Sequence, residues 1–305
     1  MKIIPNGVYP TMITPFTDDN KIDYNAVEQL IQWYADRGVA GIFAICQSSE
    51  IFFLSFEEKL ELLKFIVDKA PKGVSIIASG HTADDIETQI EEAKAICDVG
   101  IDAYVFISNR FAAPEESDDV LLERMTKVAN ALPEDIGLGV YECPYPYKRI
   151  LSPYLLKEMS KNPRYQFLKD TCCSIEMIKA KLDAVKGTNL RIFNANSATL
   201  LESLRLGCAG FSGVMANFHP ELYAELCEIY ESNPEKAEKI QNFVGFASVA
   251  EYQLYPVNAK YHLKLTGIDM GIHTRSKDAT RFTESQRKEI EQLYKLTEMF
   301  KEMIK

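Results

Sequence analysis

The chain has 305 residues, of which 47% are hydrophobic and 26% charged, as in ordinary globular proteins with a large core. Its formal net charge is −10, so the surface repels nucleic-acid phosphates and anionic lipid, and we expect neither as a partner. No apolar run approaches the ~20 residues that cross a bilayer. The first residues lack the pattern of a secretory signal, so we predict a cytoplasmic location.

Short apolar segments alternate with amphipathic segments along most of the chain. The predicted strands are residues 8–13, 41–46, 74–78, 103–107, 137–141, 166–169, 191–194 and 210–214. The predicted helices between them are residues 25–37, 57–69, 83–98, 117–131, 153–160, 174–183, 197–206 and 220–230. Regular alternation implies a parallel sheet, and eight units favour an α/β fold closed into a (β/α)8 TIM barrel. No Gly-x-Gly-x-x-Gly follows the first strand, which disfavours a dinucleotide-binding sheet.

The strand pattern ends near Tyr230. Helical periodicity then covers residues 235–251, 256–265 and 283–305. We therefore predict a barrel over residues 1–232 and a C-terminal helical extension over residues 233–305. The extension is expected to pack on the barrel or on a neighbouring subunit.

Side chains at the carboxyl ends of the strands are the candidate active site of such a barrel. Lys169 closes an apolar run, and burial lowers the pKa of a lysine so that its neutral amine attacks carbonyl carbon. Tyr141 ends the neighbouring strand and offers a phenol for proton transfer. Ser48 and Ser49 offer hydroxyl and backbone donors for a small carboxylate. Each residue alone has a plainer structural explanation, but together they predict Schiff-base chemistry on a 2-oxo acid.

Cysteines and histidines give no sign of a metal site. The seven cysteines contain no Cys-x-x-Cys pair, and the four histidines are scattered along the chain. We therefore expect neither a metal nor another cofactor. For His81, at the end of the third strand, a structural hydrogen bond is a better prediction than a place in the pocket.

Two markers stand together at this spacing: a lysine followed by an aspartate, Lys169-Asp170, and a tyrosine two residues before Cys143-Pro144. With residues 7–16, 54–60 and 255–260, they make the chain resemble the dihydrodipicolinate synthase / N-acetylneuraminate lyase family over nearly its whole length. The resemblance implies a class I lyase or aldolase, in which a lysine forms a Schiff base with pyruvate, and a barrel with a helical extension. It also implies a homo-oligomer, either a tetramer or a dimer.

The resemblance assigns roles to individual residues. Lys169 becomes the Schiff-base lysine, Tyr141 the phenol that assists proton transfer, and Ser48 the hydroxyl that holds the pyruvate carboxylate. Gln47 stands where the family has a serine or threonine of a proton relay, and Ser49 where it has glycine. The predicted substrate-binding residues are Ser48, Ser49, Gln47, Asn196 after the seventh strand and Ser212 in the eighth.

Two further departures concern the second substrate. Phe111 replaces a relay tyrosine of the synthases, and Pro146 stands where they carry an arginine that binds the aldehyde substrate. Arg110, Lys148 and Arg149 are possible substitutes for that arginine. We therefore predict a lyase or aldolase acting on pyruvate or a longer 2-oxo acid, with an aldehyde as the other partner. The alternatives are dihydrodipicolinate synthase itself, a 2-oxo-3-deoxy sugar acid dehydratase, and a non-catalytic 2-oxo acid binding protein.

Overall fold

The computed structural model describes residues 1–305. Its strands are β1 (Gly7–Val8), β2 (Gly41–Phe43), β3 (Ser75–Ala78), β4 (Ala103–Ile107), β5 (Gly137–Tyr141), β6 (Tyr165–Asp170), β7 (Arg191–Asn194) and β8 (Gly210–Phe211). All pairings are parallel, in the order β1-β8-β7-β6-β5-β4-β3-β2. A parallel bridge between Thr11 and Phe43 joins the two ends of this sheet. The predicted (β/α)8 barrel is confirmed.

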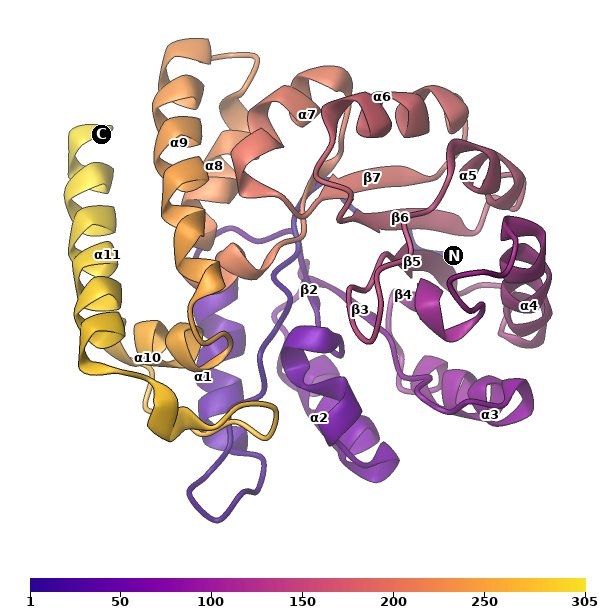
Figure 1. Cartoon of the computed structure of the whole chain (residues 1–305), viewed down its shortest axis with the longest axis horizontal. Coiled ribbons are helices and arrows are strands. Elements are labelled where there is room, and N and C mark those ends of the chain that lie inside the picture. The colour runs from indigo at the N-terminus through magenta and orange to yellow at the C-terminus, as the bar shows by residue number, and fades with distance from the viewer.

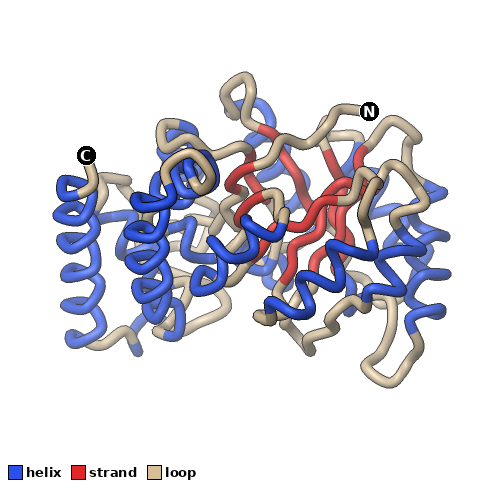
Figure 2. Tube along the Cα trace, turned by 90° about the horizontal axis from the view of Figure 1, so that it is seen from above, coloured by secondary structure: helices blue, strands red, loops and turns tan.

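Eight helices follow the strands and surround them (Figures 1 and 2). They are α1 (Tyr24–Ala35), α2 (Phe56–Lys69), α3 (Ile86–Cys97), α4 (Asp118–Ala131), α5 (Pro153–Met159), α6 (Ile175–Ala184), α7 (Leu200–Leu206) and α8 (Pro220–Ile229). Six of them begin where a side chain accepts a backbone N–H, which satisfies a donor that the helix leaves free. These capping residues are Asp23, Ser55, Asp85, Ser117, Ser152 and Ser174.

The first and last strands are shorter than predicted. Regular pairing of β1 stops at Val8, and Pro10 has no N–H to donate to a continuing ladder. Beyond it the chain keeps the single bridge at Thr11. The predicted strand 210–214 pairs regularly over its first two residues, and a 3-10 turn begins at Val214.

Three further helices form the C-terminal extension: α9 (Pro234–Ala247), α10 (Val257–Leu265) and α11 (Glu284–Met303). They lie together on one side of the barrel, next to α1 and α8 (Figure 1). The predicted boundary at residue 232 falls between α8 and α9, and the division itself stays a prediction. None of the helices combines the length and the apolar character needed to cross a membrane.

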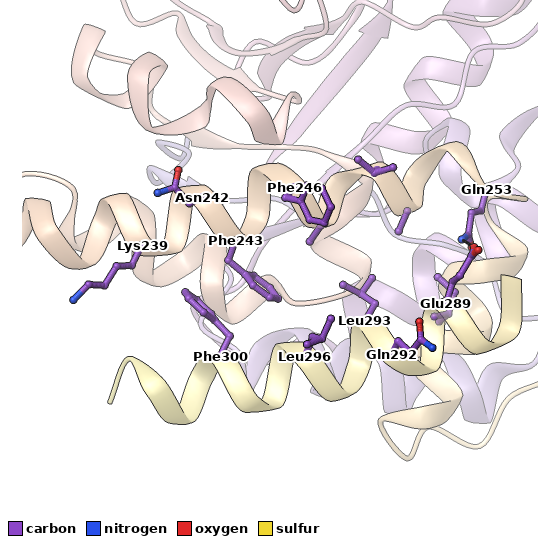
Figure 3. Close-up of a pocket in the computed structure, with 14 residues that line it drawn as sticks. Lys239, Asn242, Phe243, Phe246, Gln253, Glu289, Gln292, Leu293, Leu296 and Phe300 are labelled. Atoms are coloured by element: carbon purple, nitrogen blue, oxygen red, sulfur yellow. Dashed lines mark hydrogen bonds between the residues drawn. The ribbon is translucent and has the colours of Figure 1, made fainter. Parts of the chain in front are cut away.

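The extension carries an apolar groove on its own surface. Between α9 and α11 lies a groove of about 870 Å³ (Figure 3). The rings of Phe243 and Phe300 stack in it with centroids 4.4 Å apart, while Phe246 above them is 82% exposed. Large exposed apolar surfaces of this kind mark interaction sites.

Candidate active site

Lys169 lies inside the barrel because of the alternation along β6. Side chains two residues apart share a face of a strand, and Phe167 packs inside the barrel against Tyr9 and Phe193. Lys169 therefore points to the same interior, nearer the carboxyl end. Its side chain is 3% exposed, and its Nζ lies 4.2 Å from the centroid of the Tyr141 ring. The amine and the phenol ring are thus in contact.

This burial changes the acidity of the amine. Removal from water disfavours the charged form and lowers the pKa of Lys169 to about 8, while Cys46, Cys143 and Glu251 act in the opposite direction. A lysine with this pKa supplies far more neutral amine near pH 7 than an ordinary surface lysine does. Lys169 is therefore prepared to act as a nucleophile.

Tyr141 is paired with Lys169 across the ladder between β5 and β6. Its hydroxyl donates a long hydrogen bond, 3.4 Å, to Oε1 of Gln47. Cys143 donates its thiol proton to the same oxygen at 3.3 Å. Burial raises the pKa of Tyr141, so the phenol stays protonated and is available as an acid. The side-chain oxygen of Gln47 therefore orients the Tyr141 hydroxyl by accepting its hydrogen bond.

The two serines in the loop after β2 point in different directions. The 3-10 turn Gln47–Ser49 places Ser48 at the cavity, where its Oγ donates to Oγ1 of Thr11 at 3.1 Å. Ser49 is fully buried and its Oγ lies 2.7 Å from two backbone carbonyl oxygens. Ser48 thus faces the cavity, whereas Ser49 fastens the loop to the barrel wall.

A cavity of about 400 Å³ opens above these groups. Its wall combines the loops after β2 and β5, Val214 after β8 and two segments of the C-terminal extension. Tyr141 and Ser48 line it, and Lys169 lies behind the Tyr141 ring. The volume is within the usual range for small-molecule sites. No group of three or more His, Cys, Asp or Glu side chains is placed to hold a metal ion.

Asn196 and Ser212 lie outside the wall of this cavity. Oδ1 of Asn196 accepts the backbone N–H of Thr199 at 3.2 Å and so caps a short 3-10 turn. Ser212 is fully buried, and its Oγ donates to the carbonyl oxygen of Tyr9 at 3.0 Å. Both side chains have structural partners here, and their role in substrate binding stays a prediction.

The extension contributes side chains that the strand-end rule does not predict. Tyr255 lines the cavity, and its hydroxyl accepts from Nδ2 of Asn217 at 3.2 Å. Glu251 is half-buried; burial raises its pKa, and the nearby charge of Lys169 opposes the rise. Residues 255–260 belong to the segments that carry the family resemblance, which was the available signal for Tyr255.

Comparison with known proteins decides the family. Residues 4–297 match the model of the Dihydrodipicolinate synthetase family. The chain belongs to this family. A 4-hydroxy-tetrahydrodipicolinate synthase of Pseudoalteromonas atlantica is 25% identical over 264 residues, which are 86% of this chain and 88% of the relative. The match confirms the predicted resemblance, and with it a lyase or aldolase as the type of enzyme.

Two solved structures illustrate the shared fold. CdNal from Clostridium difficile, determined in complex with mannosamine, has a TM-score of 0.84 at 19% identity, covering 95% of this chain and 98% of that one. YagE from E. coli, determined in complex with pyruvate, has a TM-score of 0.86 at 22% identity, covering 97% and 98%. The barrel and the helical extension are therefore common to these proteins.

This family member uses Phe111 and His81 to fill space between β3 and β4. The two rings lie 5.0 Å apart, and Phe111 is buried. His81 makes the structural hydrogen bonds predicted for it, to the Tyr104 hydroxyl at 2.5 Å and from the Ile107 N–H at 3.0 Å. Burial lowers the pKa of His81 to about 3, so it stays neutral. Neither ring supplies a hydroxyl to the cavity.

The two arginines near Pro146 are held away from the cavity. Arg110 donates to the carbonyl oxygens of residues 82 and 83 and pairs with Asp84 at 2.5 Å. Arg149 donates to two carbonyl oxygens and pairs with Asp118 at 3.1 Å. Their guanidinium groups are therefore committed to neighbouring loops.

Behind the catalytic candidates lies a buried ion cluster. Glu142 and Asp170 directly follow Tyr141 and Lys169, so alternation turns them outward. Both carboxylates lie 2.5 Å from Nζ of Lys181 on α6, and all three side chains are fully buried. Burial opposes the charge of Lys181, yet the two carboxylates raise its pKa. The cluster ties the ends of β5 and β6 together just behind the reactive amine.

We expect replacement of Lys181 by methionine to destabilise the protein by about 3–5 kcal/mol, because two buried carboxylates lose their counter-ion. Urea unfolding measures this loss. Lys179→Met, at an exposed lysine of the same helix, is the control and should change stability by less than ~0.5 kcal/mol. A loss for Lys181→Met no larger than that of the control would contradict the role of the cluster.

The acidity of Lys169 predicts a pH profile. Only the deprotonated amine attacks a carbonyl, so the rate of pyruvate adduct formation should rise with pH and level off above a midpoint near pH 8. Because the carboxylate of Glu251 raises the pKa of Lys169, Glu251→Gln should move this midpoint to lower pH. Trapping with cyanoborohydride across the pH range measures both midpoints. Glu228→Gln, at an exposed site on α8, should leave the midpoint unchanged; an equal shift in both variants refutes the assignment.

Proposed function

We propose that Lys169 forms a Schiff base with the C2 carbonyl of pyruvate or a longer 2-oxo acid. The amine adds to the carbonyl carbon, and the resulting carbinolamine loses water to give an iminium. Loss of a proton from C3, the carbon next to C2, then gives an enamine, and C3 forms a bond to the aldehyde carbon. In the reverse direction this bond breaks, and its electrons pass to the iminium nitrogen. The observation that carries this proposal is a buried amine, with a pKa of about 8, in contact with a phenol ring.

The surrounding side chains support this chemistry. The Tyr141 hydroxyl is the proton donor for the departing carbinolamine oxygen, and Gln47 orients it. Ser48 and the N–H groups of its turn bind the substrate carboxylate. YagE, which shares the fold, was determined with pyruvate, and this supports pyruvate as the first substrate.

The alternatives differ in their support. Dihydrodipicolinate synthase itself is disfavoured, because Phe111 has no hydroxyl and neither nearby arginine reaches the cavity. A 2-oxo-3-deoxy sugar acid dehydratase would use the same lysine and the same first intermediate. The pairing of Lys169 with Tyr141 favours turnover over mere binding, since a binding protein needs no nucleophile.

We also propose that the protein is a cytoplasmic homo-oligomer in which a second copy covers the groove between α9 and α11. Phe246, which lines the groove, is 82% exposed, and two further large side chains of the extension, Tyr252 and Met303, are 83% and 80% exposed. A monomer rarely leaves so much apolar surface in water, and subunit interfaces are more apolar than the rest of the surface.

Borohydride treatment in the presence of pyruvate tests the Schiff base. We expect a stable adduct, located by mass spectrometry on the peptide that contains Lys169, and none in Lys169→Met. Lys186→Met removes an exposed lysine and serves as the control, which should retain the adduct. An adduct that persists in Lys169→Met would place the nucleophile elsewhere.

Light scattering after size-exclusion chromatography tests the oligomer. The wild-type protein should have a multiple of the chain mass, and Phe246→Glu should reduce it, because a charge is then buried between apolar surfaces. Ile3→Glu changes another exposed apolar residue, near the N-terminus, and should leave the mass unchanged. A monomeric wild type rules out this interface.

A further inference from the structure

The cavity wall contains two charged side chains, Glu50 and Lys277, and they differ in what surrounds them. Oε1 of Glu50 lies 3.3 Å from Nζ of Lys260, and its Oε2 accepts the backbone N–H groups of Arg275 and Ser276 at 2.7 and 2.6 Å. The charge of Glu50 is therefore balanced within the protein.

The charge of Lys277, by contrast, is not balanced by an acidic side chain. Lys277 takes part in none of the ion pairs of the chain, although the net charge of the protein is −10. The neighbouring Asp278 uses its carboxylate to accept from the N–H and hydroxyl of Thr280, at 2.9 and 2.6 Å. A cation without a partner thus stands at the wall of the cavity.

The turn that carries Lys277 is held rigidly. Oγ1 of Thr274 donates to the carbonyl oxygen of Lys277 at 2.7 Å and accepts its N–H at 3.1 Å. Arg275 binds Glu58 through two hydrogen bonds of 2.7 Å each and donates to the carbonyl oxygen of Phe53 at 3.0 Å. The backbone at Lys277 is therefore fixed at the cavity wall, and its exposed side chain is free to turn toward a ligand.

No other cation competes for this place. Arg110 and Arg149 are committed to carbonyl oxygens and acidic side chains of neighbouring loops. Lys148 is exposed and lies outside the cavity wall. Because the overall field of an acidic protein repels anions, an anionic group needs a local donor to enter.

We propose that Lys277, together with the hydroxyl of Ser276, binds an anionic group at the end of the substrate remote from Lys169. The group is a carboxylate or a phosphate, carried by the aldehyde or by a longer 2-oxo acid. This inference rests on the proposed Schiff-base function and specifies its substrate class. The barrel then supplies the reaction, and the C-terminal extension selects the substrate.

Two acids of equal chain length test the proposal. 2-Oxoadipate carries a second carboxylate, and 2-oxohexanoate ends in a methyl group. We expect the concentration that half-saturates borohydride-trapped adduct formation to be lower for 2-oxoadipate in the wild type. Lys277→Met should raise the half-saturating concentration of 2-oxoadipate by about 10- to 100-fold and leave that of 2-oxohexanoate unchanged. The maximal rate should not change for either acid. Lys277→Arg should retain the preference, and so should Lys148→Met.

A second experiment tests whether the anionic group that Lys277 binds is a carboxylate or a phosphate. Glyceraldehyde 3-phosphate and glyceraldehyde are compared as partners for pyruvate, in the wild type and in Lys277→Met. A loss confined to the phosphorylated aldehyde assigns the phosphate, and a loss confined to 2-oxoadipate assigns the carboxylate.

The failures are distinguishable. The assignment of Lys277 is wrong if the wild type shows no preference for either anionic compound. It is also wrong if Lys277→Met affects charged and neutral compounds equally. In both cases a pyruvate adduct on Lys169 would still support the proposed function. If Lys148→Met removes the preference, the anion site belongs to the loop after β5. If pyruvate gives no adduct, the proposed function fails. Calorimetric titration then measures the affinity of the wild type and of Lys277→Met for the two acids without a covalent step. A loss of affinity for 2-oxoadipate alone in Lys277→Met would still assign the anion site.

Discussion

The site depends on the alternation of side chains at the ends of β5 and β6. One residue of each strand, Tyr141 and Lys169, points into the barrel, and the next, Glu142 and Asp170, points outward. The inner pair is an amine and a phenol in an apolar interior, and the two carboxylates of the outer pair share the ammonium group of Lys181. A one-residue slip of either strand would exchange its own two residues, turning a carboxylate toward the interior and Tyr141 or Lys169 outward. The buried ion cluster specifies the register that the chemistry needs.

The second constraint is the attachment of the C-terminal extension to the barrel. Glu50 directly follows the turn Gln47–Ser49 and at the same time accepts two N–H groups of the turn at residues 274–277. Lys260 on α10 completes the attachment. The loop assigned to the substrate carboxylate and the turn assigned to its remote end are therefore held by a single carboxylate, so their spacing is fixed.

Local patterns in the sequence predicted the barrel and the position of Lys169 and Tyr141 at the ends of neighbouring strands, because strand alternation and strand order depend on neighbouring residues. The same patterns grouped Ser49 with Ser48, yet the direction of each hydroxyl depends on a 3-10 turn that periodicity does not encode. Lys277 was missed for a different reason. Its position at the cavity is set by contacts between residues more than two hundred positions apart, such as Arg275 with Glu58, which no local pattern reveals.

The attachment through Glu50 has a consequence for biosynthesis. Translation completes all eight strands before the segment with Tyr255, Ser276 and Lys277 leaves the ribosome, so a nascent barrel lacks the part of the cavity wall that the extension supplies. Docking of the extension is therefore the step that completes the cavity over Lys169, and it comes after the barrel has been made.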